Sequence, residues 1–237
     1  MSKIKVALCL TGDVRNDIAS FPYIYESFLL NKGKDYNIDV YISSWNNMFR
    51  SFKLYKPKNF IFEYNNHNLF KNFLYGLKPQ TQSIISKLYP ELYLTSSIHP
   101  LRNTFLMSLA NKNCFNIIKE NYDYYIKCRF DIFFEKSINL RNLLHFIDNT
   151  NFDSIISTIK GPTLKRQYDD QLFISNYKGF KIYCDFINYI EQIICETNDM
   201  SPEMLLTYYL KDRINICTWN FYHHIIRNNN LYLDPSL

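Results

Sequence analysis

Charged side chains interrupt one of the most apolar stretches of the chain, at Lys127-Cys128-Arg129-Phe130-Asp131. Burying a charge at the end of a strand costs several kcal/mol unless the charge finds a partner. Arg129 and Asp131 are two residues apart, so in an extended strand their side chains point to the same face. Two interpretations follow. The residues form a structural ion pair, or Asp131 binds a divalent metal on a diphosphate while Arg129 orients an anionic group.

The densest polar cluster contains Lys165, Arg166, Asp169 and Asp170, and an apolar strand predicted at 171–175 follows it directly. Two cations followed by two adjacent carboxylates suit an anionic substrate and a general base. The alternative is a solvated loop. Asp170 rather than Asp169 adjoins the predicted strand, which would hold its carboxylate more firmly in place.

The first predicted strand ends in Leu10-Thr11-Gly12-Asp13-Val14-Arg15, a segment with a single glycine. It matches neither the dinucleotide fingerprint nor the P-loop. Gly12 with Arg15 three residues later could still hold a nucleotide base and a phosphate. The alternative is an ordinary turn from a strand to a helix.

Strands and helices alternate from residue 3 onward, which predicts the elements that position these side chains. Strands are predicted at 3–10, 39–43, 59–64, 122–131, 153–158, 171–175, 213–218 and 221–226. Helices are predicted at 20–30, 101–119, 140–147, 178–197 and 202–210, with short helices and loops at 65–97. This pattern indicates an α/β protein with one open, mostly parallel sheet flanked by helices, in a single domain spanning 1–237. Ligands of such sheets bind beyond the carboxyl ends of the strands.

Composition restricts the class of protein. The 237 residues are 47% hydrophobic and 21% charged, which excludes collagen-like, disordered and disulfide-scaffold chains. The net charge of +5 suits an anionic small ligand or a membrane surface. The basic residues are spread along the chain, whereas nucleic-acid binders cluster them, so we expect no nucleic-acid partner.

No run approaches the roughly 18 apolar residues of a transmembrane helix, and the apolar stretch before Thr11 is too short for a signal peptide. The six cysteines show no CxxC pair and no zinc-ligand spacing, and we expect them to be free and structural. His223-His224 could supply a metal ligand or belong to the surface or the core. A cytoplasmic protein with at most peripheral membrane contact is expected.

In their order along the chain, these motifs resemble the glycosyltransferases of GT-A fold that act on surface polysaccharides in bacteria and in large DNA viruses. The matching segments cover most of the chain. They are the opening 6–15, the strand 39–45, the long helix that ends before Tyr122, the segment 126–131, the Asp169-Asp170-Gln171 motif and the helix start at 201–206.

The resemblance implies a role for each candidate residue. The opening loop and second strand of the family bind the nucleotide of a sugar donor, which implies donor contacts for Thr11, Gly12, Arg15, Trp45 and Arg129, assisted by Lys165 and Arg166. The family's metal motif is Asp-x-Asp. Only its second position matches here, so Mn²⁺ or Mg²⁺ would be held by Asp131.

The acidic pair looks like the family's acceptor-side motif, whose second carboxylate is the base of inverting members, and this implies that role for Asp170 beside Asp169. Glu203 matches a position near the acceptor.

The resemblance therefore implies an enzyme that moves a sugar from a nucleotide-sugar donor to a hydroxyl of a glycan acceptor in polysaccharide biosynthesis, with inversion. Two other classes stay open. A sugar nucleotidyltransferase has a related sheet but normally carries a Gly-rich basic loop after the first strand, for which Gly12 alone is a poor substitute. A non-catalytic module that binds a nucleotide sugar or a glycan would explain the fold without chemistry.

Overall fold

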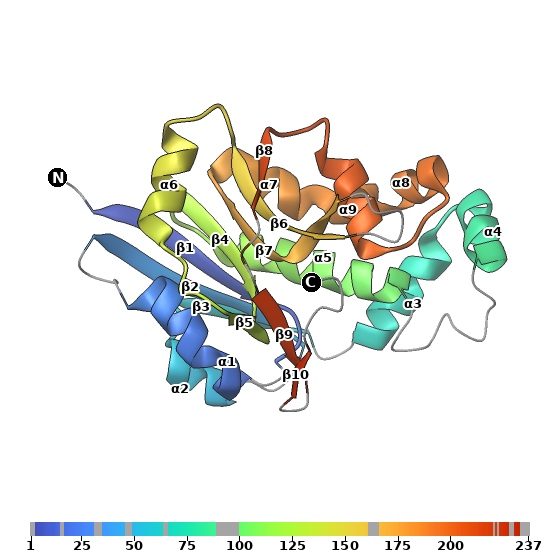
Figure 1. Cartoon of the computed structure of the whole chain (residues 1–237). Helices are drawn as coiled ribbons and strands as arrows, with labels where there is room; N and C mark the ends of the chain where they lie inside the picture. The colour runs from blue at the N-terminus through green and yellow to red at the C-terminus, as the bar shows by residue number, and fades with distance from the viewer. Residues whose placement is uncertain are drawn as a thin grey trace.

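The strands of the chain form two sheets. The computed structural model describes residues 3–14, 17–30, 35–45, 49–63, 66–88, 100–160, 166–219, 221, 223–227 and 230–232. The larger sheet has seven strands in the order β3-β2-β1-β4-β7-β6-β8, and the smaller one has the order β10-β9-β5 (Figure 1). The strands are β1 Ile4–Thr11, β2 Tyr36–Ser44, β3 Asn59–Phe62, β4 Tyr124–Arg129, β5 Ile132–Phe134, β6 Ser154–Lys160, β7 Arg166–Ser175, β8 Ile216–Trp219, β9 His223–Arg227 and β10 Asn230–Tyr232.

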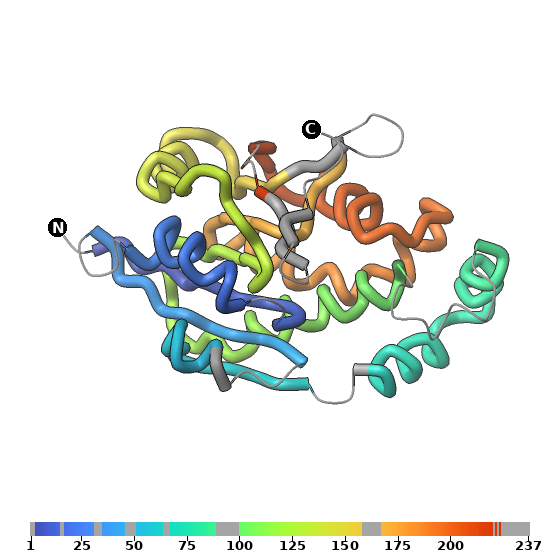
Figure 2. Tube along the Cα trace, turned by 60° about the horizontal axis from the view of Figure 1, so that its bottom comes forward, coloured from blue at the N-terminus to red at the C-terminus, as the bar shows by residue number. Residues whose placement is uncertain are grey.

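Helices cover both faces of the larger sheet, and α5 crosses behind it in Figure 1. The helices are α1 Asp17–Ile24, continued by a π-helical turn Tyr25–Leu29, α2 Phe49–Tyr55, α3 Asn66–Gly76, α4 Pro79–Leu88, α5 Pro100–Ile117, α6 Leu140–Asp148, α7 Tyr177–Asp185, a 3₁₀ turn Phe186–Tyr189, α8 Ile190–Thr197 and α9 Pro202–Leu210. Figures 1 and 2 both show α3 and α4 at the end of the molecule away from the N-terminus.

The strand directions bring the chain's polar motifs to one edge. β1 pairs in parallel with β2 and β4, β2 with β3, and β6 with β8, whereas β7 runs antiparallel to β4 and β6. The parallel strands therefore end at one edge, and β7 begins there. This arrangement confirms the predicted α/β fold with an open, mostly parallel sheet flanked by helices.

Each face of the larger sheet carries its own hydrophobic core. Alternate residues of a strand point to opposite faces. In β1, Ala7 and Cys9 join the core under α5, α7, α8 and α9, while Val6, Leu8 and Leu10 join the core under α1, α2 and α6. Burying each of the Val6, Leu8 and Leu10 side chains contributes about 1.5–3 kcal/mol, so β1 is a rigid base for the turn that follows it.

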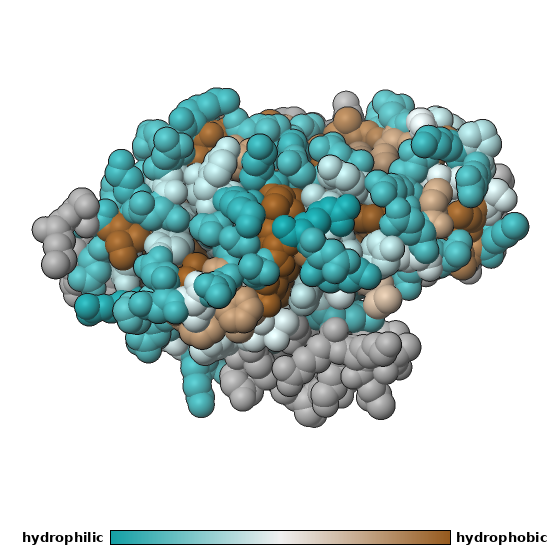
Figure 3. Space-filling model, turned by 90° about the horizontal axis from the view of Figure 1, so that it is seen from above, coloured by the Kyte–Doolittle hydropathy of each residue, from teal (hydrophilic) through white to brown (hydrophobic). Residues whose placement is uncertain are grey.

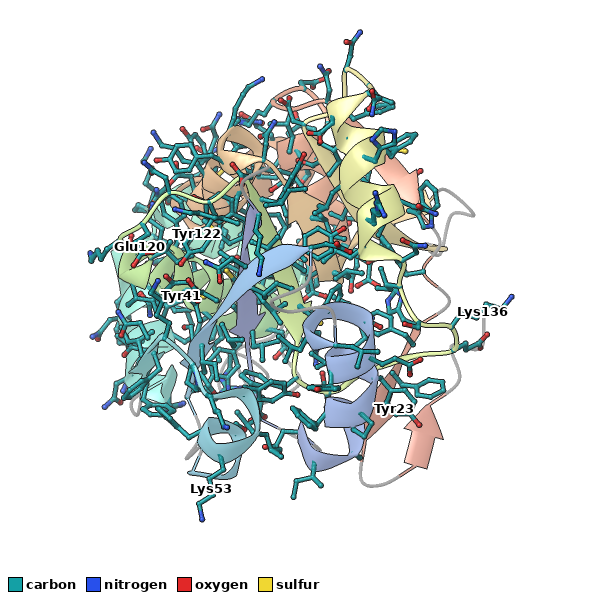
Figure 4. The ribbon with its side chains drawn as sticks, turned by 90° about the vertical axis from the view of Figure 1, so that its left-hand side faces the viewer. Tyr23, Tyr41, Lys53, Glu120, Tyr122 and Lys136 are labelled. Carbon is teal, nitrogen blue, oxygen red and sulfur yellow. The ribbon has the colours of Figure 1, made fainter. Side chains whose placement is uncertain are left out.

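A polar network secures the sheet near the start of β4. The hydroxyl groups of Tyr41 and Tyr122 are 2.7 Å apart, and Tyr122 donates to Asp39 at 2.7 Å. Lys58 pairs with Asp39 and with Glu120, and these two bonds raise the pKa of its ammonium. Figure 4 shows Tyr41, Tyr122 and Glu120 close together. The network ties β2 and β3 to the segment that leads into β4.

The face seen from above in Figure 3 is mostly hydrophilic. Apolar residues form several separate patches on it, one of them near its centre. Among the residues that the structure describes, no helix is long and apolar enough to cross a membrane.

All six cysteines are free thiols, as predicted, and four of them are buried.

The structure corrects several predicted boundaries. The first helix begins at Asp17 rather than at Ser20, whose hydroxyl lies inside the helix and donates to the Asp17 carbonyl at 3.2 Å. The predicted helix 178–197 consists of α7, the 3₁₀ turn and α8. β7 begins at Arg166 rather than at residue 171, so residues 166–170, which the sequence placed outside any predicted strand, belong to this strand. β10 was not predicted.

Candidate active site

The carboxyl ends of three neighbouring strands define the site. In the register of the sheet, Thr11 at the end of β1 lies between Ser43 of β2 and Arg129 of β4. β7 pairs with β4 up to Leu172, and its earlier residues continue past the end of β4. The structure thus brings the candidate residues of four separate motifs to one edge, the place where open α/β sheets bind ligands.

The turn after β1 is fixed by two hydrogen bonds. The Thr11 hydroxyl is buried and donates to the Asn111 side-chain oxygen on α5 at 2.8 Å. The backbone N–H of Gly12 donates to the Ser43 carbonyl at 3.0 Å, and the φ angle of Gly12 is 108°. A positive φ is readily adopted only by glycine. The turn is therefore preformed, and Thr11 supports it instead of pointing outward.

The structure describes only some of the other residues that the sequence predicts on the donor side. Trp45 follows β2 and packs, half-buried, against the core on the α5 face. Arg15 and Lys165 lie outside the described residues, and Arg166 is described only through its backbone at the start of β7. The donor contacts of these residues stay predictions.

Arg129 and Asp131 form the ion pair that was the first of the two interpretations of this motif. Arg129 donates from Nε to Oδ1 of Asp131 at 2.8 Å and from Nη2 to Oδ2 at 2.9 Å. Asp131 is fully buried, and the Arg129 side chain is 23% exposed. Burial alone would lower the pKa of Arg129, but Asp131 outweighs it and raises that pKa. Two parallel hydrogen bonds of this kind hold both groups in one geometry.

This pairing bears on the metal that the resemblance implies at Asp131. Both carboxylate oxygens of Asp131 already accept hydrogen bonds from Arg129. No group of three His, Cys, Asp or Glu side chains within the described ranges is arranged to hold a metal ion. The residues present do not fit a metal at Asp131 while Arg129 holds it.

Asp170 lies between two cations of β4. Its Oδ2 atom is 3.9 Å from Nζ of Lys127 and 3.9 Å from Nη1 of Arg129. Burial would raise the pKa of Asp170, but the charges of Lys127 and Arg129 outweigh it and lower that pKa. Asp170 is therefore a stable carboxylate at neutral pH and a weak proton acceptor.

Lys127 belongs to the site as well, although its sequence motif did not predict this. Its side chain is 1% exposed, and its ammonium has no hydrogen-bond partner among the residues described. Burial lowers its pKa, which the charge of Asp170 raises only in part. The signal that could have identified it is a lysine in the middle of an apolar strand, since a buried cation needs a function or a partner.

The acidic pair Asp169-Asp170 lies in a β-bulge of β7. Between the pairings Ile156↔Phe173 and Thr158↔Tyr168, the single residue Ser157 of β6 faces residues 169–172 of β7. Bulges disrupt the ladder locally and re-aim side chains, and they are frequent beside active sites. The bulge explains why two adjacent carboxylates can both reach the edge of the site, although neighbouring residues of a regular strand point to opposite faces.

Asp169 is held by two partners. Its Oδ1 atom accepts from the backbone N–H of Gln171 at 3.1 Å, and its Oδ2 atom lies 3.0 Å from Nε2 of His223. The His223 side chain is 7% exposed, and β9 carries it to the site from the smaller sheet. The two residues are 54 positions apart in the chain, so no local spacing could have paired them.

Glu203 lies in the first turn of α9, opposite the acidic pair. A hydrogen bond of 2.8 Å from the backbone N–H of Tyr168 to the Thr207 hydroxyl fastens this helix to β7. Burial and then the negative charge of Asp170 raise the pKa of Glu203 to about 7. Glu203 thus lies within electrostatic reach of the acidic pair, and burial gives this carboxyl a proton affinity that the sequence did not indicate. The expected place of Glu203 near the acceptor stays a prediction.

No protein-family model matches the chain, and none of the curated proteins has a matching sequence. Solved structures do match. Mouse xyloside xylosyltransferase 1 in its apo form superposes with a TM-score of 0.51 at 10% identity, over 92% of this chain and 85% of that one. Core-mannan synthase A of Aspergillus fumigatus, in a form with Mn and GDP, superposes with a TM-score of 0.50 at 11% identity, over 92% of this chain and 73% of that one.

Both neighbours are glycosyltransferases by name, and the likeness at this identity is one of fold. The chain therefore has a GT-A-like glycosyltransferase fold. The bacterial or viral surface-polysaccharide type stays a prediction from the sequence motifs.

Proposed function

We propose that this protein is a glycosyltransferase that moves a sugar from a nucleotide-sugar donor to a hydroxyl group of a glycan acceptor, with inversion at the anomeric carbon. The observation that carries the proposal is the cluster of buried and half-buried charges at the carboxyl edge of the sheet, in which Lys127 and Arg129 face Asp169, Asp170 and Glu203. Such a cluster is costly for the fold, and its place in a GT-A-like fold supports a role in transfer.

The donor side of the proposal uses the turn after β1 and the two cations of β4. Among the described residues, nothing lies within 4 Å of the position where Gly12 would carry a Cβ, so a ligand can approach the backbone there. Arg129 is partly exposed at the edge, and Lys127 lies behind it. Their positive charges would stabilise the negative charge that develops on the leaving nucleoside diphosphate.

The acceptor side uses the carboxylates. The oxygen of an acceptor hydroxyl attacks the anomeric carbon and forms a new C–O bond, while the bond from that carbon to the diphosphate oxygen breaks and its electron pair leaves with the diphosphate. A carboxylate takes up the hydroxyl proton. The resemblance implies Asp170 for this task and a surface polysaccharide as the acceptor class.

A donor panel tests the proposal. The purified protein is incubated with UDP-, GDP-, TDP- and CMP-sugars, with and without manganese, and release of the nucleotide is measured beside the thermal shift that each free nucleotide causes. Turnover of one donor supports the proposal if it is lost in an Arg129→Gln protein that still unfolds cooperatively in a thermal melt and is kept in the control Lys87→Gln, because Lys87 is an exposed cation on α4.

Two results would contradict it. Formation of a nucleotide sugar from a nucleoside triphosphate and a sugar phosphate would identify a nucleotidyltransferase. A thermal shift without turnover of any donor would identify a binding module.

A further inference from the structure

The carboxylates of the site differ in what occupies their oxygens. Both oxygens of Asp131 accept from Arg129, and both oxygens of Asp169 have partners, one of them His223. Asp170 lies between Lys127 and Arg129. Glu203 forms no ion pair and no hydrogen bond to another side chain within the part of the chain that the structure describes.

We propose that Glu203, rather than Asp170, is the general base of the transfer and takes the proton from the acceptor hydroxyl. This inference rests on the proposed function. A base needs a lone pair that is free to meet the hydroxyl and a support that keeps it in place. No other side chain binds the Glu203 carboxylate among the described residues, and its one hydrogen bond there is from its own backbone N–H. The helix α9 is anchored through Thr207 and through the buried side chains of Leu205 and Leu206.

The surrounding charges favour the same assignment. From β7, Asp169 and Asp170 face Glu203 with negative charge, and from β4 Arg129 opposes them. His223 of β9 is bound to Asp169. Burial and these negative charges bring the pKa of Glu203 to about 7, whereas the two cations hold the pKa of Asp170 below its ordinary value. A base works best when its pKa lies near the working pH, so Glu203 is the better proton acceptor.

Asp170 and Glu203 then have different roles in the reaction. Asp170 keeps its charge beside Lys127 and Arg129, so that these cations stay in position for the leaving diphosphate. Glu203 takes the hydroxyl proton while the C–O bond forms and releases it to water after the product leaves. Each turnover returns Glu203 to the carboxylate form.

The test compares Glu203→Gln with Asp170→Asn, using the nucleotide sugar that the donor panel identifies. In Glu203→Gln we expect kcat to fall about 10²–10⁴-fold. The thermal shift caused by the nucleoside diphosphate should stay as in the wild type. In the wild type kcat should rise with pH through a pKa near 7 and then level off, and this rise should be absent in Glu203→Gln. Glu203→Asp, which keeps the carboxylate, should recover part of the rate.

Other outcomes overturn the assignment. If Glu203→Gln keeps near-normal turnover and Asp170→Asn loses it with an unchanged nucleotide shift, Asp170 is the base. A product that retains the anomeric configuration, read by NMR, shows that no such base is used. If the wild type turns over no donor at all, the proposed function itself fails and the base assignment falls with it. If NMR then shows the Glu203 carboxyl of the wild type titrating near pH 7, the raised pKa is correct and only the proposed function is wrong.

Discussion

Arg129 binds both carboxylate oxygens of Asp131, at 2.8 Å and 2.9 Å, and Asp131 has no exposed surface. Asp131 is therefore a buried anion whose charge is met mainly by one guanidinium group. Breaking such a pair is costly because it leaves one charge buried without a partner, even where the pair itself adds little net stability.

Arg129→Met should therefore lower the free energy of unfolding by about 3–5 kcal/mol in urea denaturation. The matched control is Lys58→Met, which removes a cation from the more exposed pairs with Asp39 and Glu120 and should cost no more than about 1 kcal/mol. Equal losses in the two variants would mean that the pair does not hold the end of β4. If Asp131 instead binds a metal, EDTA should weaken nucleotide binding in the wild type.

Gly12→Ala tests the turn after β1. Its φ of 108° strains any residue with a Cβ, although no described atom would clash with that Cβ. We expect a loss of roughly 1–3 kcal/mol in the free energy of unfolding, from backbone strain alone. Gly76→Ala on α3 is the control, since Gly76 has the same open surroundings without a positive φ, and it should be neutral or stabilising. A Gly12 variant as stable as its control would argue against the preformed turn.

The stability of the protein should depend on pH through Glu203. Folding raises the pKa of this carboxyl from 4.5 to about 7, so the folded state favours its protonated form. The resulting stability is fully present below pH 4.5 and is lost as the pH rises through about 7. The uncharged Gln side chain of Glu203→Gln does not titrate, so this variant keeps its stability as the pH rises. The difference in the free energy of unfolding between Glu203→Gln and the wild type should therefore grow across this interval, to at most about 3 kcal/mol.

Urea unfolding of both proteins at pH 5, 6, 7 and 8 measures this divergence. Glu196→Gln, on the exposed side of α8, controls for the loss of one acidic side chain. Curves for wild type and Glu203→Gln that stay parallel across the whole range would rule out the raised pKa.

The thiols should react in two groups. Cys9, Cys114, Cys128 and Cys184 are buried, and burial raises the pKa of Cys128 to about 12, so little thiolate is present there at neutral pH. Cys195 and Cys217 are partly exposed. Mass spectrometry after brief alkylation of the native protein should find modification confined to these two residues, and all six should react in denaturant. Labelling of Cys128 at the rate of Cys195 would show that the core opens.

The sequence predicted the sheet well because its inner strands are continuous apolar runs, as in Val6-Ala7-Leu8-Cys9-Leu10. It failed at the start of β7, where Arg166 to Asp170 are mostly polar and suggested a loop. A strand that lines a site carries polar residues because they face ligand or one another, so the hydrophobic pattern ends before the strand does.

Partners far apart in the chain could not be predicted either. Asn111, which fixes Thr11, lies on a different element, and His223 reaches Asp169 only because β9 pairs with β5. The Arg129–Asp131 pair was among the interpretations because its two members share one short segment. The raised pKa of Glu203 depends on charges from two other strands, which no spacing within α9 could reveal.

The pairing of β9 with β5 also sets an order of events during synthesis. A ribosome that has made residues 4–219 has produced every strand of the seven-stranded sheet, but it has not yet made His223. Until β9 emerges and adds to β5, Asp169 is a carboxylate without its imidazole neighbour. All strands of the seven-stranded sheet therefore precede His223 in the chain, and the contact between Asp169 and His223 spans 54 residues and depends on β9.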